Sequence, residues 1–159
     1  MKLHYQTLGN GQPLIILHGL FGTLENWGSQ IKTLSESFNV IAVDLRNHGR
    51  SPHSDEMNYS VMADDVIELM DDLGLKTAKL MGHSMGGKVA MQMALNHAER
   101  IQQLIIVDIA PVHYERHHDD VLKGLNTLDL PNIKSRSDAD ASLAHFISDI
   151  GVRAFLLKN

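Results

Sequence analysis

The residues with the clearest chemical use lie in the segment Gly82-His83-Ser84-Met85-Gly86. It places a serine in a Gly-x-Ser-x-Gly frame between a predicted strand and a predicted helix. A serine at so sharp a turn has an exposed hydroxyl, and the next backbone N–H lies at a helix N-terminus. A side chain at Gly82 or Gly86 would collide with the neighbouring backbone. We therefore predict that Ser84 is a nucleophile; the alternative is a glycine-rich turn that serves only helix–sheet packing.

Two further turns with polar residues each follow a predicted buried strand. The first reads His18-Gly19-Leu20-Phe21-Gly22, and the second reads Asp44-Leu45-Arg46-Asn47-His48-Gly49-Arg50-Ser51. His18 could be a catalytic base, but we expect it to brace its loop through a hydrogen bond. In the second turn we expect Asp44 and Arg46 to form an ion pair that braces the loop rather than a reactive pair.

Together these motifs resemble those of the α/β-hydrolase superfamily, and they occur in the expected order. The second turn matches the Asp-x-Arg-Gly-x-Gly-x-Ser loop of that superfamily, with Asn47 where glycine is usual. Asparagine tolerates left-handed backbone angles, so this departure is mild. From Leu14 to about Asn159 the chain is similar to the YbfF-type bacterial esterases, on the motifs His-Gly-Leu-Phe-Gly, Asp-Leu-Arg-Asn-His-Gly, Gly-His-Ser-Met-Gly-Gly-Lys and Val-Asp-Ile-Ala-Pro.

The resemblance implies roles for residues around the serine. Acyl transfer needs two backbone N–H groups that point at one developing oxyanion, since loss of one donor costs about 3 kcal/mol of transition-state stabilisation. We predict that the N–H groups of Leu20 and Met85 form this oxyanion hole. Asp108, which follows the apolar run 104–107, is implied as the acid that orients a histidine. The alternative is that Asp108 only caps the turn before Pro111.

The histidine that would complete this machinery is not expected among the ten in this sequence. Each of the ten histidines has a structural explanation first, and in the resembled esterases the base lies near the C-terminus of a longer chain. We therefore expect the triad histidine beyond Asn159 or in another chain, and we expect little activity from these residues alone. The adjacent His117 and His118, with Asp119 and Asp120, could suggest a metal site. Neighbouring residues on a helix point apart, so we expect no metal there.

The order of predicted elements indicates an α/β fold with a doubly wound, mostly parallel sheet of the α/β-hydrolase type. Continuous apolar strands of this kind are buried on both faces. Residues 2–8 add an N-terminal strand. The remaining predicted strands lie near 14–17, 39–43, 78–82 and 103–108, and they alternate with helices near 29–37, 59–73 and 85–97.

Two domains are predicted, because the composition turns polar after Pro111. Residues 1–110 form the N-terminal part of the hydrolase core. Residues 111–159 form the start of a helical cap, with helices near 113–127 and 138–157. We expect the C-terminal strands of the fold to be missing from these residues, and we therefore expect the strand 103–108 to be the outer edge of the sheet.

Composition excludes several other functions. The formal net charge of −5, without a basic run, argues against a nucleic-acid partner. The absence of cysteine excludes disulfides, thiolate catalysis and cysteine-ligated zinc, and it is compatible with a reducing cytoplasm, where we expect the protein to be. No apolar stretch approaches the ~20 residues that span a bilayer.

The leading hypothesis is a serine carboxylic-ester hydrolase that forms an acyl-enzyme on Ser84 and cleaves small acyl esters or thioesters. Serine acyl transfer needs no cofactor, and we expect none. Phe21 is a candidate for the wall of the substrate pocket, which its apolar ring would suit to an aliphatic acyl group. The alternative hypothesis is a non-catalytic binding or regulatory module with the same fold.

Overall fold

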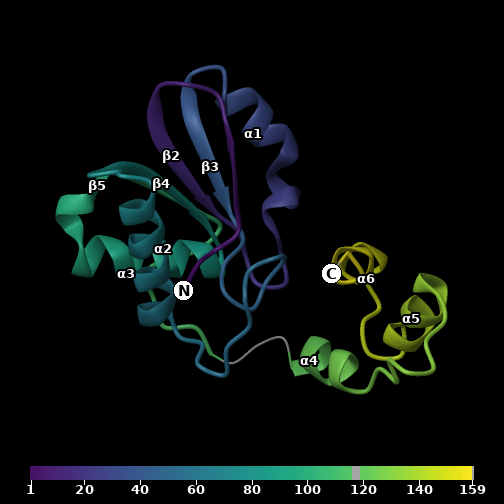
Figure 1. The fold of residues 1–159 in the computed structure, drawn as a ribbon. Coiled ribbons are helices and arrows are strands. Elements are labelled where there is room, and N and C mark those ends of the chain that lie inside the picture. Colours follow the sequence, from purple (N-terminus) through teal and green to yellow (C-terminus); the bar gives the residue numbers. More distant parts are fainter. Residues whose placement is uncertain (116–118, 159) are drawn as a thin grey trace. The chain divides into compact units, whose positions relative to one another are not determined.

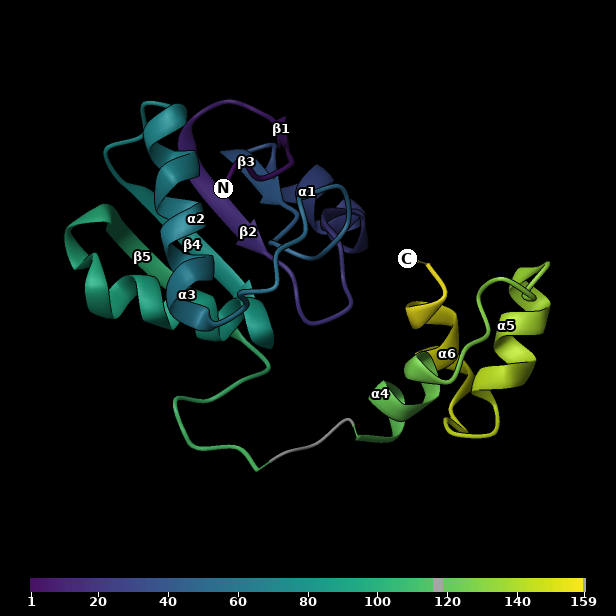
Figure 2. The same ribbon diagram turned by 60° about the horizontal axis from the view of Figure 1, so that its bottom comes forward.

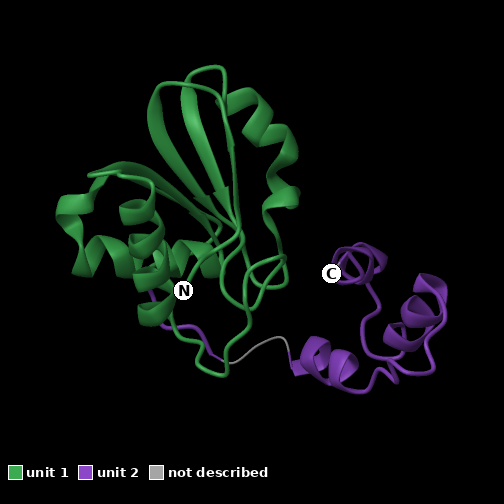
Figure 3. Ribbon diagram, viewed as in Figure 1, with its two compact units in different colours: residues 1–111 green, residues 112–159 purple. Residues whose placement is uncertain are grey.

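The computed structural model describes residues 1–115 and 119–158 and divides the chain into two compact units. The first unit is Met1–Pro111 and the second is Val112–Asn159 (Figure 3). The predicted domain boundary lay one residue earlier, after residue 110. That the second unit serves as a cap over an active site stays a prediction.

The first unit is built on a five-stranded sheet with the strand order β1-β3-β2-β4-β5 (Figure 1). β2, β3, β4 and β5 run parallel, and β1 pairs with β3 in the antiparallel direction. The predicted α/β fold with a mostly parallel sheet is therefore confirmed. The strands are β1 Tyr5–Leu8, β2 Gln12–Leu17, β3 Phe38–Val43, β4 Ala78–His83 and β5 Ile101–Val107.

Helices cover both faces of this sheet, as a doubly wound fold requires. Figure 2 shows α2 and α3 on one face and α1 on the other. The side chain of Asn58 caps the start of α2 by accepting the N–H of Val61. The helices are α1 Gly28–Leu34, α2 Tyr59–Asp72 and α3 Met85–Asn96, and two short 3-10 helices are η1 Leu24–Trp27 and η2 Ala98–Arg100.

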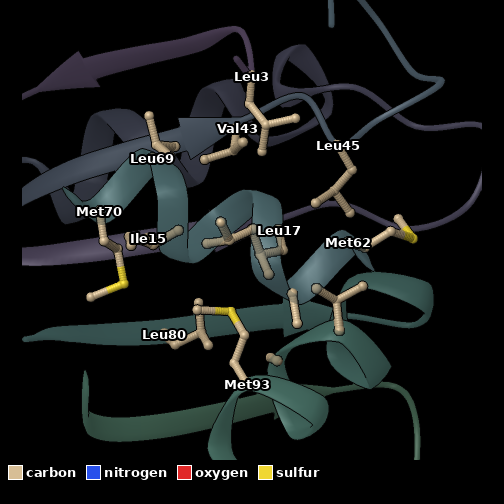
Figure 4. Packing of buried hydrophobic residues seen from close by; sticks show 14 of the residues in the cluster. Leu3, Ile15, Leu17, Val43, Leu45, Met62, Leu69, Met70, Leu80 and Met93 are labelled. Atoms are coloured by element: carbon tan, nitrogen blue, oxygen red, sulfur yellow. The ribbon is translucent and has the colours of Figure 1, made fainter. Parts of the chain in front are cut away.

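The larger hydrophobic core lies between the sheet and the α2–α3 layer (Figure 4). Successive residues of a strand point to opposite faces, so Ile15 and Leu17 enter this core while Leu14 and Ile16 face α1. Burial on both faces explains why these strands are continuously apolar rather than alternating. The sheet is thus a rigid platform whose carboxyl edge carries the predicted site residues.

The second unit contains three helices among its described residues, α4 Asp119–Asn126, α5 Arg136–Leu143 and α6 Ile150–Leu156. The predicted short helices near 113–127 and 138–157 overlap these, and the second stretch holds two of them, α5 and α6. Ser135 caps the start of α5 and Asp149 caps the start of α6, each by accepting a backbone N–H three residues on. Residues 113–115 precede α4 without regular structure, and His117 and His118 lie outside the described residues.

β5 is the outer strand of the sheet in the described part of the chain, as predicted. Its first half carries the exposed residues Gln102, Gln103 and Leu104. No helix in the described residues is both long enough and apolar enough to cross a membrane.

Candidate active site

Ser84 occupies a strained turn between β4 and α3. Its φ of 49° and ψ of −114° lie in a region that L-residues rarely adopt. A Cβ added at Gly82 would overlap the carbonyl oxygen of Gly86, and one added at Gly86 would overlap the carbonyl oxygen of Leu17. The prediction that both outer glycines are needed is confirmed. Their close contacts press the start of α3 against the end of β2 and hold the serine at the turn.

The loop after β2 lies directly against Ser84. A Cβ added at Gly19 would stand 3.4 Å from the Cβ of Ser84. The loop turns tightly, because the N–H of Gly22 donates to the carbonyl of Gly19 at 3.0 Å. Within the part of the chain that the structure describes, the N–H groups of Leu20 and Met85 donate no hydrogen bond. Both predicted oxyanion donors therefore remain available for a ligand.

Phe21 belongs to the same loop and has a φ of 59°. Its side chain is half-buried. A left-handed conformation at a bulky residue is uncommon and indicates a backbone that its surroundings hold in place. Its role in the wall of a substrate pocket stays a prediction.

His18 stabilises this loop through hydrogen bonds of its buried ring, as predicted. Its side chain is buried (1% exposed). The Nδ1 atom lies 2.8 Å from the carbonyl oxygen of Gly19, and the Nε2 atom accepts the N–H of Leu45 at 3.0 Å. The ring is thus neutral with its proton on Nδ1, and burial lowers its pKa from 6.5 to about 4. With both nitrogens engaged, His18 has none left to act as the base for Ser84.

The loop after β3 is held by a different arrangement from the predicted one. Asp44 does not pair with Arg46; its carboxylate accepts the N–H of Leu24 at 2.8 Å and that of Arg50 at 3.0 Å. Arg46 instead forms a two-pronged ion pair with Asp65 on α2, at 2.6 and 2.8 Å. Arg46 pairs with Asp65 because the backbone N–H groups of Leu24, in η1, and of Arg50 already occupy the Asp44 carboxylate.

Asn47 adopts a φ of 64°, which confirms that it takes the left-handed conformation usual for glycine at this position. Its side-chain amide donates to the carbonyl of Ser54, and its side-chain oxygen accepts the N–H of Ser54. The substitution of asparagine for glycine thereby ties the loop to the segment that leads into α2.

Asp108 lies at the end of β5, beside the end of β4 that carries Ser84. The two strands are parallel, so their carboxyl ends meet at one edge. The N–H of Ser84 donates to the carbonyl of Val107 at 3.0 Å, which fixes the two strand ends together. The Asp108 side chain is 85% exposed and its φ is 55°. It forms no part of the core and is open to a partner.

One contact at this edge escaped the sequence prediction. The Nε2 atom of His83 lies 3.7 Å from Oδ2 of Asp108. The pairing of β4 with β5 places His83 opposite Val107, one residue before the aspartate. The sequence pattern located both strand ends, but only the register of the pair brings the imidazole to the carboxylate.

In the described residues the structure brings no histidine into hydrogen-bond contact with Ser84. The Ser84 hydroxyl makes no hydrogen bond with any residue that the structure describes. Nor do three or more histidine, cysteine or acidic side chains converge on a point suited to a metal ion in residues 1–115 and 119–158. The arrangement has a serine, two free N–H groups and a carboxylate, which are parts of an acyl-transfer site.

Comparison with known proteins agrees with this geometry. Residues 12–131 match the family described as alpha/beta hydrolase fold. Esterase YbfF of Escherichia coli (strain K12) is 39% identical over 155 residues, which cover 97% of this chain and 61% of that protein. The sn-1-specific diacylglycerol lipase ABHD11 of Mus musculus is 37% identical over 170 residues, which cover 100% of this chain and 55% of that protein.

A solved structure described as a marine microorganism esterase superimposes with a TM-score of 0.96 at 39% identity, and the match covers 99% of this chain and 63% of that one. The chain thus spans about 60% of the length of these relatives. The family match, the high identity and the shared topology lead to one conclusion: the chain belongs to the α/β-hydrolase fold family.

Proposed function

We propose that this chain carries the nucleophile, oxyanion hole and acid of a serine ester hydrolase. The observation that carries the proposal is the strained backbone of Ser84, held against the loop that contains Gly19, while the N–H groups of Leu20 and Met85 donate no hydrogen bond in the described residues. Strain of this size persists only where the surroundings impose it, and it is typical of functional sites. The relatives named esterase and diacylglycerol lipase support the same reaction class.

In the proposed reaction, the Ser84 oxygen attacks the acyl carbon of an ester or thioester while its proton passes to a histidine. The N–H groups of Leu20 and Met85 stabilise the oxyanion of the tetrahedral intermediate. Collapse of this intermediate expels the alcohol or thiol, which takes the proton from the histidine, and leaves an acyl-enzyme. Water then attacks the acyl carbon by the same route, and Asp108 orients the histidine throughout.

We place the histidine on sequence beyond Asn159 or on another chain. Asp108 supports this placement, because its carboxylate is exposed and no strand lies on the far side of β5 in the part of the chain that the structure describes. The substrate is proposed to be a small acyl ester or thioester, with Phe21 at the wall of the acyl pocket and no cofactor.

The proposal is tested by labelling the full-length gene product with a fluorophosphonate and by measuring hydrolysis of p-nitrophenyl esters. We expect stoichiometric labelling that Ser84→Ala abolishes, together with a loss of hydrolysis of about 10⁴-fold or more. Ser29→Ala, which removes an exposed hydroxyl from α1, is the matched control and should label normally.

A full-length protein that resists labelling and hydrolyses no ester would contradict the proposal. That result would favour the alternative, a non-catalytic binding or regulatory module. The free Ser84 hydroxyl in the described residues is the observation that keeps this alternative open.

A further inference from the structure

His83 lies between the two halves of the proposed site, and the proposed reaction assigns it no task. Its ring abuts the loop of residues 18–22 after β2, which carries the proposed oxyanion donor Leu20 and is called the oxyanion loop below, since a Cβ added at Gly19 would stand 3.0 Å from its Nδ1 atom. The ring of Trp27 meets it edge-on, with the centroids 6.2 Å apart and the planes at 72°. The imidazole is therefore held on two sides, and its Nε2 atom is left to face Asp108 at 3.7 Å.

Asp108 is the least restrained member of the proposed site. Its side chain is 85% exposed, whereas that of His83 is 39% exposed. An exposed carboxylate samples several rotamers, and that freedom must be lost before it can orient a histidine. A neighbouring hydrogen-bond donor whose own position is fixed would therefore help to hold this carboxylate in one rotamer.

We propose that His83 is a positioning residue that restrains the Asp108 carboxylate and thereby couples the oxyanion loop to the acid. The inference rests on the proposed function, because the restraint matters only if Asp108 orients a histidine. A carboxylate can accept partners at both oxygens. With Oδ2 turned to His83, Oδ1 is left for the histidine that serves Ser84.

The effect falls on orientation rather than on stability. At 3.7 Å the contact is longer than a hydrogen bond, and ion pairs this exposed contribute little to folding. The chain offers a matched control in His97, whose Nε2 lies 3.6 Å from Oδ1 of Asp64. The exposures of that pair are 30% and 64%, and it lies where α3 ends, away from the proposed site.

The first measurement is steady-state ester hydrolysis by the full-length protein. We expect His83→Ala to lower kcat about tenfold with KM unchanged, because the orientation of the acid matters in the transition state rather than in substrate binding. His83→Gln retains an N–H donor and should recover most of the loss. His97→Ala should leave kcat unchanged.

A double-mutant cycle separates this role from a general structural one. In an Asp108→Asn background, His83→Ala should cause no further loss of kcat, because the residue acts through the acid. Losses that multiply in the double variant would overturn the proposal, and so would a His83→Ala protein as active as His97→Ala.

The second measurement does not depend on activity. In ¹⁵N spectra of the imidazole rings, Asp108→Asn should shift the signals of His83 and leave those of His97 in place, and Asp64→Asn should do the reverse. Unchanged His83 signals in Asp108→Asn overturn the proposal whatever the enzyme does. Hydrolysis that survives Ser84→Ala would instead refute the proposed function, with the His83–Asp108 contact judged by the spectra alone.

Discussion

The loops after β2 and β3 and the loop after β5 share one edge of the sheet, but they are held in opposite ways. In the first two, His18, Asp44 and Arg46 are buried, and hydrogen bonds satisfy each of them. In the third, the Asp108 carboxylate is 85% exposed. The loops after β2 and β3 are thus held by contacts within the fold, whereas the Asp108 carboxylate is open to a partner.

The difference follows from the place of each strand in the sheet. β2 and β3 have neighbours on both sides, so polar groups at their ends are enclosed and must find partners within the fold. β5 has a neighbour on one side only among the described residues, so water can solvate the group at its end. Polar groups at the ends of the central strands are therefore fixed by hydrogen bonds, whereas the carboxylate at the end of the outer strand stays accessible.

The strongest test of this comparison is Asp65→Ala in the full-length protein. The substitution leaves the buried Arg46 guanidinium without its two-pronged partner, which should lower the free energy of unfolding by about 4 kcal/mol. Asp71→Ala removes an exposed partner of Arg100 and should cost about 1 kcal/mol or less. Urea unfolding followed by circular dichroism measures both free energies of unfolding. Equal losses in the two variants would refute the idea that buried ion pairs hold the loops after β2 and β3.

The second test is the pH dependence of stability. The pKa of His18 is about 4 in the folded protein, against 6.5 as its usual value. Between these values the unfolded chain binds a proton that the folded chain does not, so stability is lost as the pH falls. From pH 7 to 4.5 the expected loss from His18 is about 2 to 3 kcal/mol. Burial also lowers the pKa of His48, so this residue adds to the loss of stability as the pH falls.

Urea unfolding at several pH values measures this slope. His18→Gln carries no titrating ring and should flatten it between pH 6.5 and 4.5. If the free energy of unfolding falls as steeply with pH in His18→Gln as in the unchanged sequence, His18 in the loop after β2 is not the source of the pH dependence.

The third test concerns the strain at Ser84. Glycine adopts a positive φ without steric penalty, whereas alanine keeps the strain of serine. Ser84→Gly should therefore be more stable than Ser84→Ala by about 1 kcal/mol, measured from thermal midpoints, while both lack ester hydrolysis. Equal midpoints would mean that the turn is relaxed and that strain plays no part in the site.

The smallest effect on stability is expected at the exposed Asp108, after β5. Asp108→Asn should change the free energy of unfolding by no more than about 0.5 kcal/mol, because the side chain lies outside the core. Ester hydrolysis should nevertheless fall about 10³-fold, because a neutral amide does not hold the histidine in the reactive tautomer. A large loss of stability would mean that Asp108 is a structural cap before Pro111.

The strands could be predicted from the sequence because their signal is local. Each predicted parallel strand overlaps the observed one, since runs such as 14–17 and 40–43 are apolar at every position and end at polar turns. The helices of the second unit were harder to predict from the sequence. The stretch 138–157 has helical character throughout, but Asp149 satisfies the first N–H groups of a new helix and so divides it.

The contacts of the site depended on information that is not local. Arg46 and Asp65 are 19 residues apart and meet only because α2 packs over the end of β3. The contact between His83 and Asp108 depends on the register of β4 against β5. Motifs therefore located the chemistry, whereas the pairing of side chains had to come from the packing of the elements.

The open side of β5 also affects how the 159 residues behave in the test tube. An unpaired strand offers a row of N–H and C=O groups that can accept the strand of a second molecule. Gln102, Gln103 and Leu104 carry no charge that would repel such a strand. Where no further strand covers β5, we expect this edge to favour edge-to-edge association at high concentration, and dilution should reverse it.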